Sequence, residues 1–115
     1  MNQGQRWEEY ALQHLSAQGL RLVQRNYHCR FGEIDLVMWH DSTLVFVEVR
    51  YRKSSRYGSA AESVTQSKRR RLLLTAGHYL QRQRLLPEPP CRFDVVAIGG
   101  AQGEAFEWIM DAFGE

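Results

Sequence analysis

The chain is poor in cysteine and has no long apolar run, and both absences narrow its class. Its two cysteines, Cys29 and Cys91, form no C-x-x-C pair, and its four histidines show no spacing typical of zinc ligands. No stretch is long enough to span a bilayer, and segment 1–10 lacks the apolar centre of a signal peptide. These features predict a cytoplasmic protein without a membrane partner, whose thiols stay reduced.

No linker, internal repeat or low-complexity tract divides the 115 residues. A hydrophobic content of 43% and a charged content of 24% are typical of a globular protein. A chain of this length can bury one core, so we expect a single domain over residues 1–115.

Acidic residues are scarce between positions 50 and 71, although the net charge of the chain is only +2. Glu62 is the only acid in that segment. The basic residues there are Arg50, Arg52, Lys53, Arg56, Lys68, Arg69, Arg70 and Arg71. Such a block suits a polyanion, because each neutralised phosphate releases counterions. A solvated face is the alternative, but the acidic hairpin beside the block favours a nucleic acid as the partner.

That hairpin, residues 32–50, consists of two apolar strands joined by the polar turn 40–43. If the turn is symmetric, the numbers of paired residues sum to 83, and Asp35 lies across from Glu48. Facing side chains have Cβ atoms roughly 4.5–5.5 Å apart, where two like charges are destabilising. The pairing therefore favours a metal or a shared proton between the carboxylates. A turn with an odd number of residues would instead send Asp35 to the other face.

The same symmetry places Glu33 opposite Arg50, which shares the face of Glu48 because the two lie two residues apart. The strand is apolar on both faces until Glu48, which predicts a central position in the sheet.

Around the hairpin we expect helices over residues 5–18 and from the N-cap Thr65 to about Leu85, strands over 20–27, 92–98 and 104–109, and a loop over 52–62. These elements predict an α/β domain with a mixed, mostly antiparallel central sheet of about five strands, flanked by helices. Asp94 is a lone acid in an apolar strand, and we expect it to pair with a nearby arginine; the alternative is that it joins the metal site.

Three residues on the helices have two interpretations each. Glu8 begins an apolar stripe, so it needs a partner or belongs to a site, unless it is solvated near the helix N-terminus. Lys68 points inward from the first turn, as a phosphate neighbour or as a lysine extended along Leu72. Trp7 either packs in the core or stacks on a base.

Carboxylates from two strands and a helix form an oxygen-rich set that suits Mg²⁺ or Mn²⁺. A cation held by Asp35 and Glu48 would polarise a phosphate and activate a water. Arg50 would stabilise the charge that develops in the transition state. The candidate catalytic residues are thus Glu8, Asp35, Glu48 and Arg50, and the candidate nucleic-acid-binding residues are Arg52, Lys53, Arg56, Lys68 and Arg69.

Several short motifs run along the chain: Gly4-x-x-x-Glu8, Arg30-x-Gly-Glu-Ile-Asp-Leu-Val, Phe46-Val-Glu-Val-Arg, Arg92-Phe-Asp-Val-Val and Ala112-Phe113. In these motifs, over nearly its whole length, the chain resembles the YraN family of uncharacterised bacterial proteins. That family looks like restriction-endonuclease-type nucleases and is similar to archaeal Holliday-junction resolvases. The resemblance implies a restriction-endonuclease-like core and a divalent-metal-dependent endonuclease for structured or branched DNA. It also implies Asp35 and Glu48 as metal ligands, Glu8 as an accessory carboxylate, and a homodimer.

Position 50 departs from the family, whose strand usually ends in Glu-x-Lys. Arg50 keeps the positive charge and grips phosphate in a fork, but it does not release a proton at working pH. Activity suffers if this position must orient or deprotonate water. A non-catalytic nucleic-acid-binding module that retains the nuclease fold is therefore the alternative function. A domain whose basic face binds an acidic protein is a third.

Overall fold

The computed structural model describes residues 2–53 and 64–114. Its elements, in chain order, are α1 (Gln3–Ala17), β1 (Arg21–Cys29), β2 (Gly32–His40), β3 (Thr43–Arg52), α3 (Gln66–Gln83), β4 (Cys91–Gly99) and β5 (Ala105–Phe113). Most of the predicted loop 52–62 lies outside the described residues. None of the described helices is long and apolar enough to cross a membrane.

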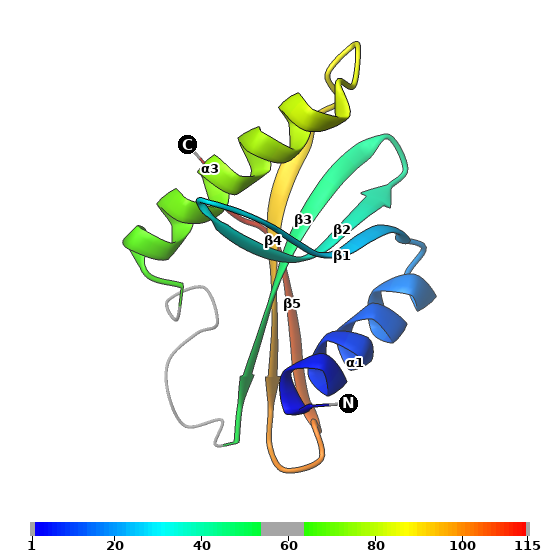
Figure 1. Ribbon diagram of the computed structural model, residues 1–115. Helices are drawn as coiled ribbons and strands as arrows, with labels where there is room; N and C mark the ends of the chain where they lie inside the picture. Colours follow the sequence, from blue (N-terminus) through cyan, green and yellow to red (C-terminus); the bar gives the residue numbers. More distant parts are fainter. Residues whose placement is uncertain (1, 54–63, 115) are drawn as a thin grey trace.

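The five strands form one twisted sheet in the order β1-β2-β3-β4-β5 (Figure 1). Only β3 and β4 pair in parallel, and α3 lies in the crossover between them, as a parallel connection requires. The other neighbouring strands are antiparallel. The prediction of a mixed, mostly antiparallel sheet flanked by helices is confirmed, and β3 is its central strand as expected.

Two separate cores cover the two faces of the sheet, because β3 is apolar on both sides. Leu44 and Phe46 belong to the core beneath α3, whereas Val45 and Val47 belong to the core beneath α1. The chain thus has three layers, with the sheet between the two helices (Figure 1).

The register of the central hairpin follows the predicted symmetry. Its pairs run from His40 with Thr43 to Leu36 with Val47, and each pair of numbers sums to 83. Beyond Leu36 the strands separate. The prediction that Glu33 lies opposite Arg50 is wrong, because the register between β2 and β3 ends at Leu36 and Val47 and leaves Glu33 paired with His28 of β1.

The departure of β2 from β3 has a steric explanation at its first residue. The end of the β1–β2 hairpin lies against α3, and a Cβ on Gly32 would sit 3.3 Å from Thr75 Oγ1. Glycine permits this close approach. Docking on α3 therefore bends the hairpin away from β3 and opens a gap at the level of Asp35.

The long helix begins as predicted, since the Thr65 side chain accepts the Lys68 N–H at 3.2 Å. Its buried residues are Leu72, Thr75, Ala76 and Tyr79, which form one stripe on the same side of the helix as Lys68. This stripe fixes the rotation of α3 and points its first turn at the sheet.

Asp94 lies fully buried in β4 and pairs with an arginine, as expected. Arg92 Nε donates to its Oδ1 at 2.9 Å, and the indole N–H of Trp108 donates to its Oδ2 at 2.9 Å. The backbone N–H of Asp111 is a further donor at 3.0 Å. These bonds hold β5 against β4 and occupy Asp94, so it serves the fold rather than the site described below.

We expect Asp94→Asn to lower the free energy of unfolding by about 2–4 kcal/mol, because it leaves Arg92 facing an uncharged, partly mismatched group in the interior. Urea denaturation measures the change. Asp111→Asn, at an exposed side chain, is the matched control and should stay within about 0.5 kcal/mol of wild type. A loss of under 0.5 kcal/mol in Asp94→Asn would contradict the assignment.

Candidate functional site

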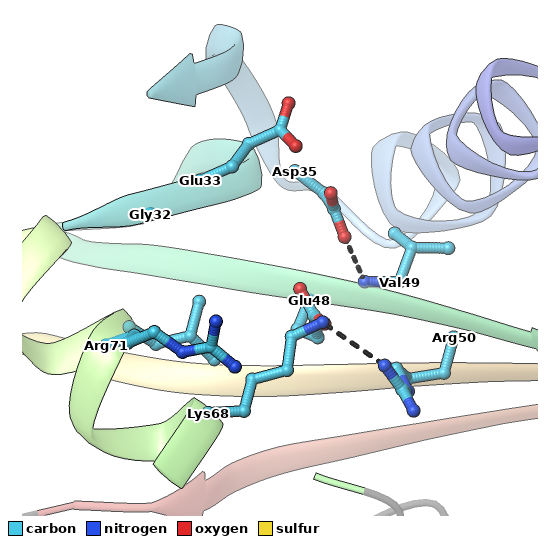
Figure 2. Close-up of a pocket in the computed structure, with 9 residues that line it drawn as sticks. Gly32, Glu33, Asp35, Glu48, Val49, Arg50, Lys68 and Arg71 are labelled. Atoms are coloured by element: carbon cyan, nitrogen blue, oxygen red, sulfur yellow. Dashed lines mark hydrogen bonds and ion pairs between the residues drawn. The ribbon is translucent and has the colours of Figure 1, made fainter. Parts of the chain in front are cut away.

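Glu48 lies on the α3 side of β3, only 5% exposed, beneath two cations. Lys68, in the first turn of α3, places its Nζ 2.7 Å from Glu48 Oε2. Arg50 lies further along β3, with Nη1 3.7 Å from the same oxygen (Figure 2). The predicted inward direction of Lys68 is confirmed, and its ammonium contacts a buried carboxylate.

Asp35 lies on β2 immediately before Leu36, which is the residue farthest from the turn that pairs with β3. Its Oδ2 accepts the backbone N–H of Val49 at 2.7 Å, so the carboxyl bridges the gap between the separating strands (Figure 2). Burial, the negative charge of Glu48 and a hydrogen bond with Glu48 together raise the pKa of Asp35 to about 9, although the Val49 N–H opposes them. Asp35 and Glu48 therefore interact as predicted, although they do not pair in the sheet, because the register between β2 and β3 ends at Leu36 and Val47.

With its pKa raised to about 9, Asp35 keeps its proton at neutral pH. Among the described residues, both ion pairs of this cluster go to Glu48. An incoming cation would replace this proton and release it to solvent.

Glu8 approaches Asp35 from the opposite side, on α1. Its Oε1 accepts the side-chain N–H of Asn26 at 2.8 Å, and its charge adds to the raised pKa of Asp35. Of the two interpretations of Glu8, the one that requires a partner is confirmed. Glu8 and Asp35 line a hollow of about 280 Å³ together with Trp7 and Tyr51.

A second hollow, of about 250 Å³, opens on the α3 side of Asp35 and carries the positive charge. Its charged lining residues are Glu33, Asp35, Glu48, Arg50, Lys68 and Arg71 (Figure 2). Arg71 was not among the predicted site residues, although its spacing of three from Lys68 places both on one side of α3. Asn26 was also missed, since only the register of β1 brings it near.

The other predicted basic residues lie elsewhere. Arg52 and Lys53 are exposed at the end of β3, and Arg56 lies outside the described residues. Arg69 donates from Nε to the Val64 carbonyl at 3.0 Å, and its guanidinium lies 5.5 Å from the centre of the Phe113 ring. Arg69 therefore faces the C-terminal strand, and neither it nor Arg52 lines the hollow on the α3 side.

Trp7 belongs to the core, and of its two interpretations this one is confirmed. It is 3% exposed and stacks on Tyr51, with the ring centres 4.2 Å apart. A base has no access to a ring covered in this way.

The donor set suits a hard divalent cation bound in part by water and substrate. In the described part of the chain no three His, Cys, Asp or Glu side chains lie so that they could hold a metal ion together, so the expected set of three carboxylates is not formed and Glu8 stays outside it. Mg²⁺ typically uses one or two carboxylates and keeps its other positions for waters and phosphate oxygens. Asp35 and Glu48 meet that requirement. A metal ion would compete with the Lys68 ammonium for the Glu48 carboxylate.

Fold and site together define a mixed α/β domain in which buried carboxylates and cations meet where two central strands separate. The chain belongs to the uncharacterised protein family UPF0102, whose model matches residues 7–98. It is 50% identical to a family member from Nitrosococcus oceani over 97% of this chain and 91% of that one. It is 53% identical to one from Saccharophagus degradans, over 96% and 91% of the two chains, and 50% identical to one from Nitrosomonas europaea, over 99% and 95%. The resemblance to this family of uncharacterised bacterial proteins is confirmed, and the likeness of the family to nucleases stays a prediction.

Proposed function

We propose that this protein is a divalent-metal-dependent endonuclease with a restriction-endonuclease-like core, acting on structured or branched DNA. One observation carries the proposal: the half-buried Asp35 and the buried Glu48 adjoin a hollow lined by Arg50, Lys68 and Arg71. A purely structural pair of acids would not require three cations at an opening to solvent.

Each residue of the site has its own role in the proposed phosphodiester hydrolysis. Mg²⁺ or Mn²⁺ held by Asp35 and Glu48 would supply Lewis acidity toward the phosphate and toward a bound water. Asp35 gives up its proton to become a ligand. Arg50 and Lys68 hold the phosphate oxygens and stabilise the charge that develops on them. Arg50 acts here only through its charge, which arginine retains.

The direct test is cleavage of labelled DNA in the presence of Mg²⁺ or Mn²⁺, with a four-way junction, a flap and a linear duplex as substrates. We expect wild type to cut the branched substrates and Glu48→Gln to leave them intact. Glu107→Gln, at an exposed position on β5, is the matched control and should cut as wild type does. Tight DNA binding by wild type without any product would contradict the proposal.

A non-catalytic DNA-binding module is the second candidate, and Arg50 in place of the family's usual lysine favours it. If the arginine has disabled catalysis, Arg50→Lys should gain cleavage while DNA affinity stays within about threefold. If Arg50→Lys binds DNA and yields no product either, the module is supported. Affinity that falls steeply with salt would argue against an acidic protein partner.

The proposal places the protein in the cytoplasm, where the chromosome lies. It also extends to a homodimer, because a four-way junction offers two equivalent strands to two copies of one site. Light scattering with and without junction DNA tests the stoichiometry.

A further inference from the structure

Asn26 has a backbone conformation that its position in the fold does not explain. It lies inside β1, yet its φ of +50° falls in the left-handed region. Three other described residues with a Cβ share this conformation. Asp41 and Arg84 lie in a hairpin turn and at a helix C-cap, where it is common, and Asp111 lies in β5 where the register with β4 shifts. Asparagine adopts this region more readily than most residues with a Cβ, but the conformation still costs more than an extended one, and such residues concentrate at functional sites.

The strand register places Asn26 beside the carboxylate cluster. The pairs Arg25 with Leu36 and Tyr27 with Ile34 lie on either side of it, so Asn26 stands across from Asp35. The cores on either side show that the hairpin twists at this level: Ile34 packs beneath α3, and Leu36 packs beneath α1. The strained residue and the key carboxyl thus share one bend.

The side chain of Asn26 reaches from this bend to the helix on the other face. Its Nδ2 donates to Glu8 Oε1 at 2.8 Å, across 18 positions of sequence. Glu8 and Asp35 line the same hollow, so the amide holds one wall of that hollow in place.

The neighbouring pair shows why an amide matters here. Glu9 is held by the guanidinium of Arg25 at 3.1 Å, again from α1 to β1, and that contact balances its charge. Asn26 orients Glu8 by a neutral donor and leaves its negative charge in place. Among the described residues no cation pairs with Glu8, so a neutral donor alone holds its carboxylate beside the residue that would bind a cation.

We infer that Asn26 is a positioning residue, whose strained backbone holds the Glu8 carboxylate against Asp35 without neutralising it. The inference rests on the proposed function, because it assigns Asn26 to the same metal-dependent site. It acts through Glu8, in the way that outer-shell partners orient metal ligands, and their loss typically lowers metal affinity or activity 10–100-fold.

Two substitutions separate this role from a purely structural one. Asn26→Gly relieves the strain and removes the donor, so we expect a melting temperature within about 4 °C of wild type and cleavage 10–100-fold slower. Asn26→Asp keeps the shape but replaces the donor by a like charge, and it should lose activity similarly. Asp41→Gly is the matched control, since it relieves the same strain in the distant turn and should cleave within twofold of wild type.

A stability loss that accounts for the activity loss in both variants would overturn the inference, as would cleavage within twofold of wild type in Asn26→Gly. The contact itself is read without activity, from the side-chain amide signal of Asn26 in a ¹⁵N–¹H correlation spectrum. We expect Glu8→Ala to move this signal toward its position in the unfolded chain. An unmoved signal would also overturn the inference.

The failure of the proposed function has a different signature. If wild type cleaves none of the substrates, that proposal fails, and Asn26 is then judged by Mn²⁺ titration. Binding by wild type that is 10–100-fold weaker in Asn26→Gly supports the positioning role. Equal binding by the two proteins, or none by wild type, refutes it.

Discussion

Asp35→Asn is expected to abolish metal-dependent cleavage, by about 10³-fold or more, while making the metal-free protein more stable at alkaline pH. Asparagine resembles the protonated Asp35 of the resting site. Its amide oxygen can accept the Val49 N–H, and its NH₂ can donate to Glu48. The variant keeps these hydrogen bonds and loses the charge that a cation needs.

The direction of the stability change follows from the raised pKa. Asp35 has a pKa of about 9 in the folded protein and roughly 3.9 in the unfolded chain, so the folded state binds the proton more tightly. As the pH rises from about 4 to 9, the unfolded state loses this proton first. The stability of wild type therefore falls over that window, by at most about 1.4 kcal/mol per pH unit. Asp35→Asn has no such proton, and its advantage should grow with pH.

Metal binding releases the same proton from Asp35. Apparent Mn²⁺ affinity should rise by up to tenfold per pH unit until about pH 9, with about one proton released per ion at pH 7. Calorimetry in buffers of different ionisation enthalpy counts that proton. Glu33→Gln, at the exposed rim of the same hollow, is the control for a general loss of charge. Metal affinity independent of pH between 6 and 8 would contradict the assignment of the proton to Asp35.

The sequence predicted the central hairpin because its register depends on local features: a short polar turn between two apolar strands. The predicted pairing of Glu33 with Arg50 is wrong for a non-local reason. Its strand separates from β3 where Gly32 meets Thr75, and only the tertiary docking of the hairpin on α3 makes that contact. Symmetry about a turn therefore predicts the pairs near the turn and fails where another element competes for the strand.

Asn26 and Arg71 were missed for related reasons. The weak pattern of β1 gave no register, so nothing in the sequence brought Asn26 opposite Asp35. Arg71 is one of four consecutive basic residues. Consecutive residues of a helix point in different directions, so only some of the four can face one ligand, and the sequence did not show which. The rotation of α3, set by its buried stripe, selects Lys68 and Arg71 for the hollow and turns Arg69 toward Phe113.

Lys68→Met is expected to bind Mn²⁺ more tightly and yet cleave more slowly, a split that a general weakening of the site cannot produce. The Lys68 ammonium lies 2.7 Å from the buried oxygen that a cation would use. Methionine keeps an unbranched side chain but removes the competing charge. We expect a gain in metal affinity of about tenfold, modest because Lys68 is 34% exposed and solvent screens its charge.

Turnover should fall by about 10²-fold in the same variant, since the lost ammonium can no longer stabilise charge on the phosphate in the transition state. Without metal, the variant should also melt at a lower temperature, because Glu48 keeps a buried charge with one partner fewer. Arg70→Met, an exposed change in the same turn of α3, is the matched control for both measurements. If Lys68→Met loses metal affinity and turnover together, Lys68 supports the binding of the cation instead of competing with it. The division of roles between the carboxylate pair and the cations above it would then have to be redrawn.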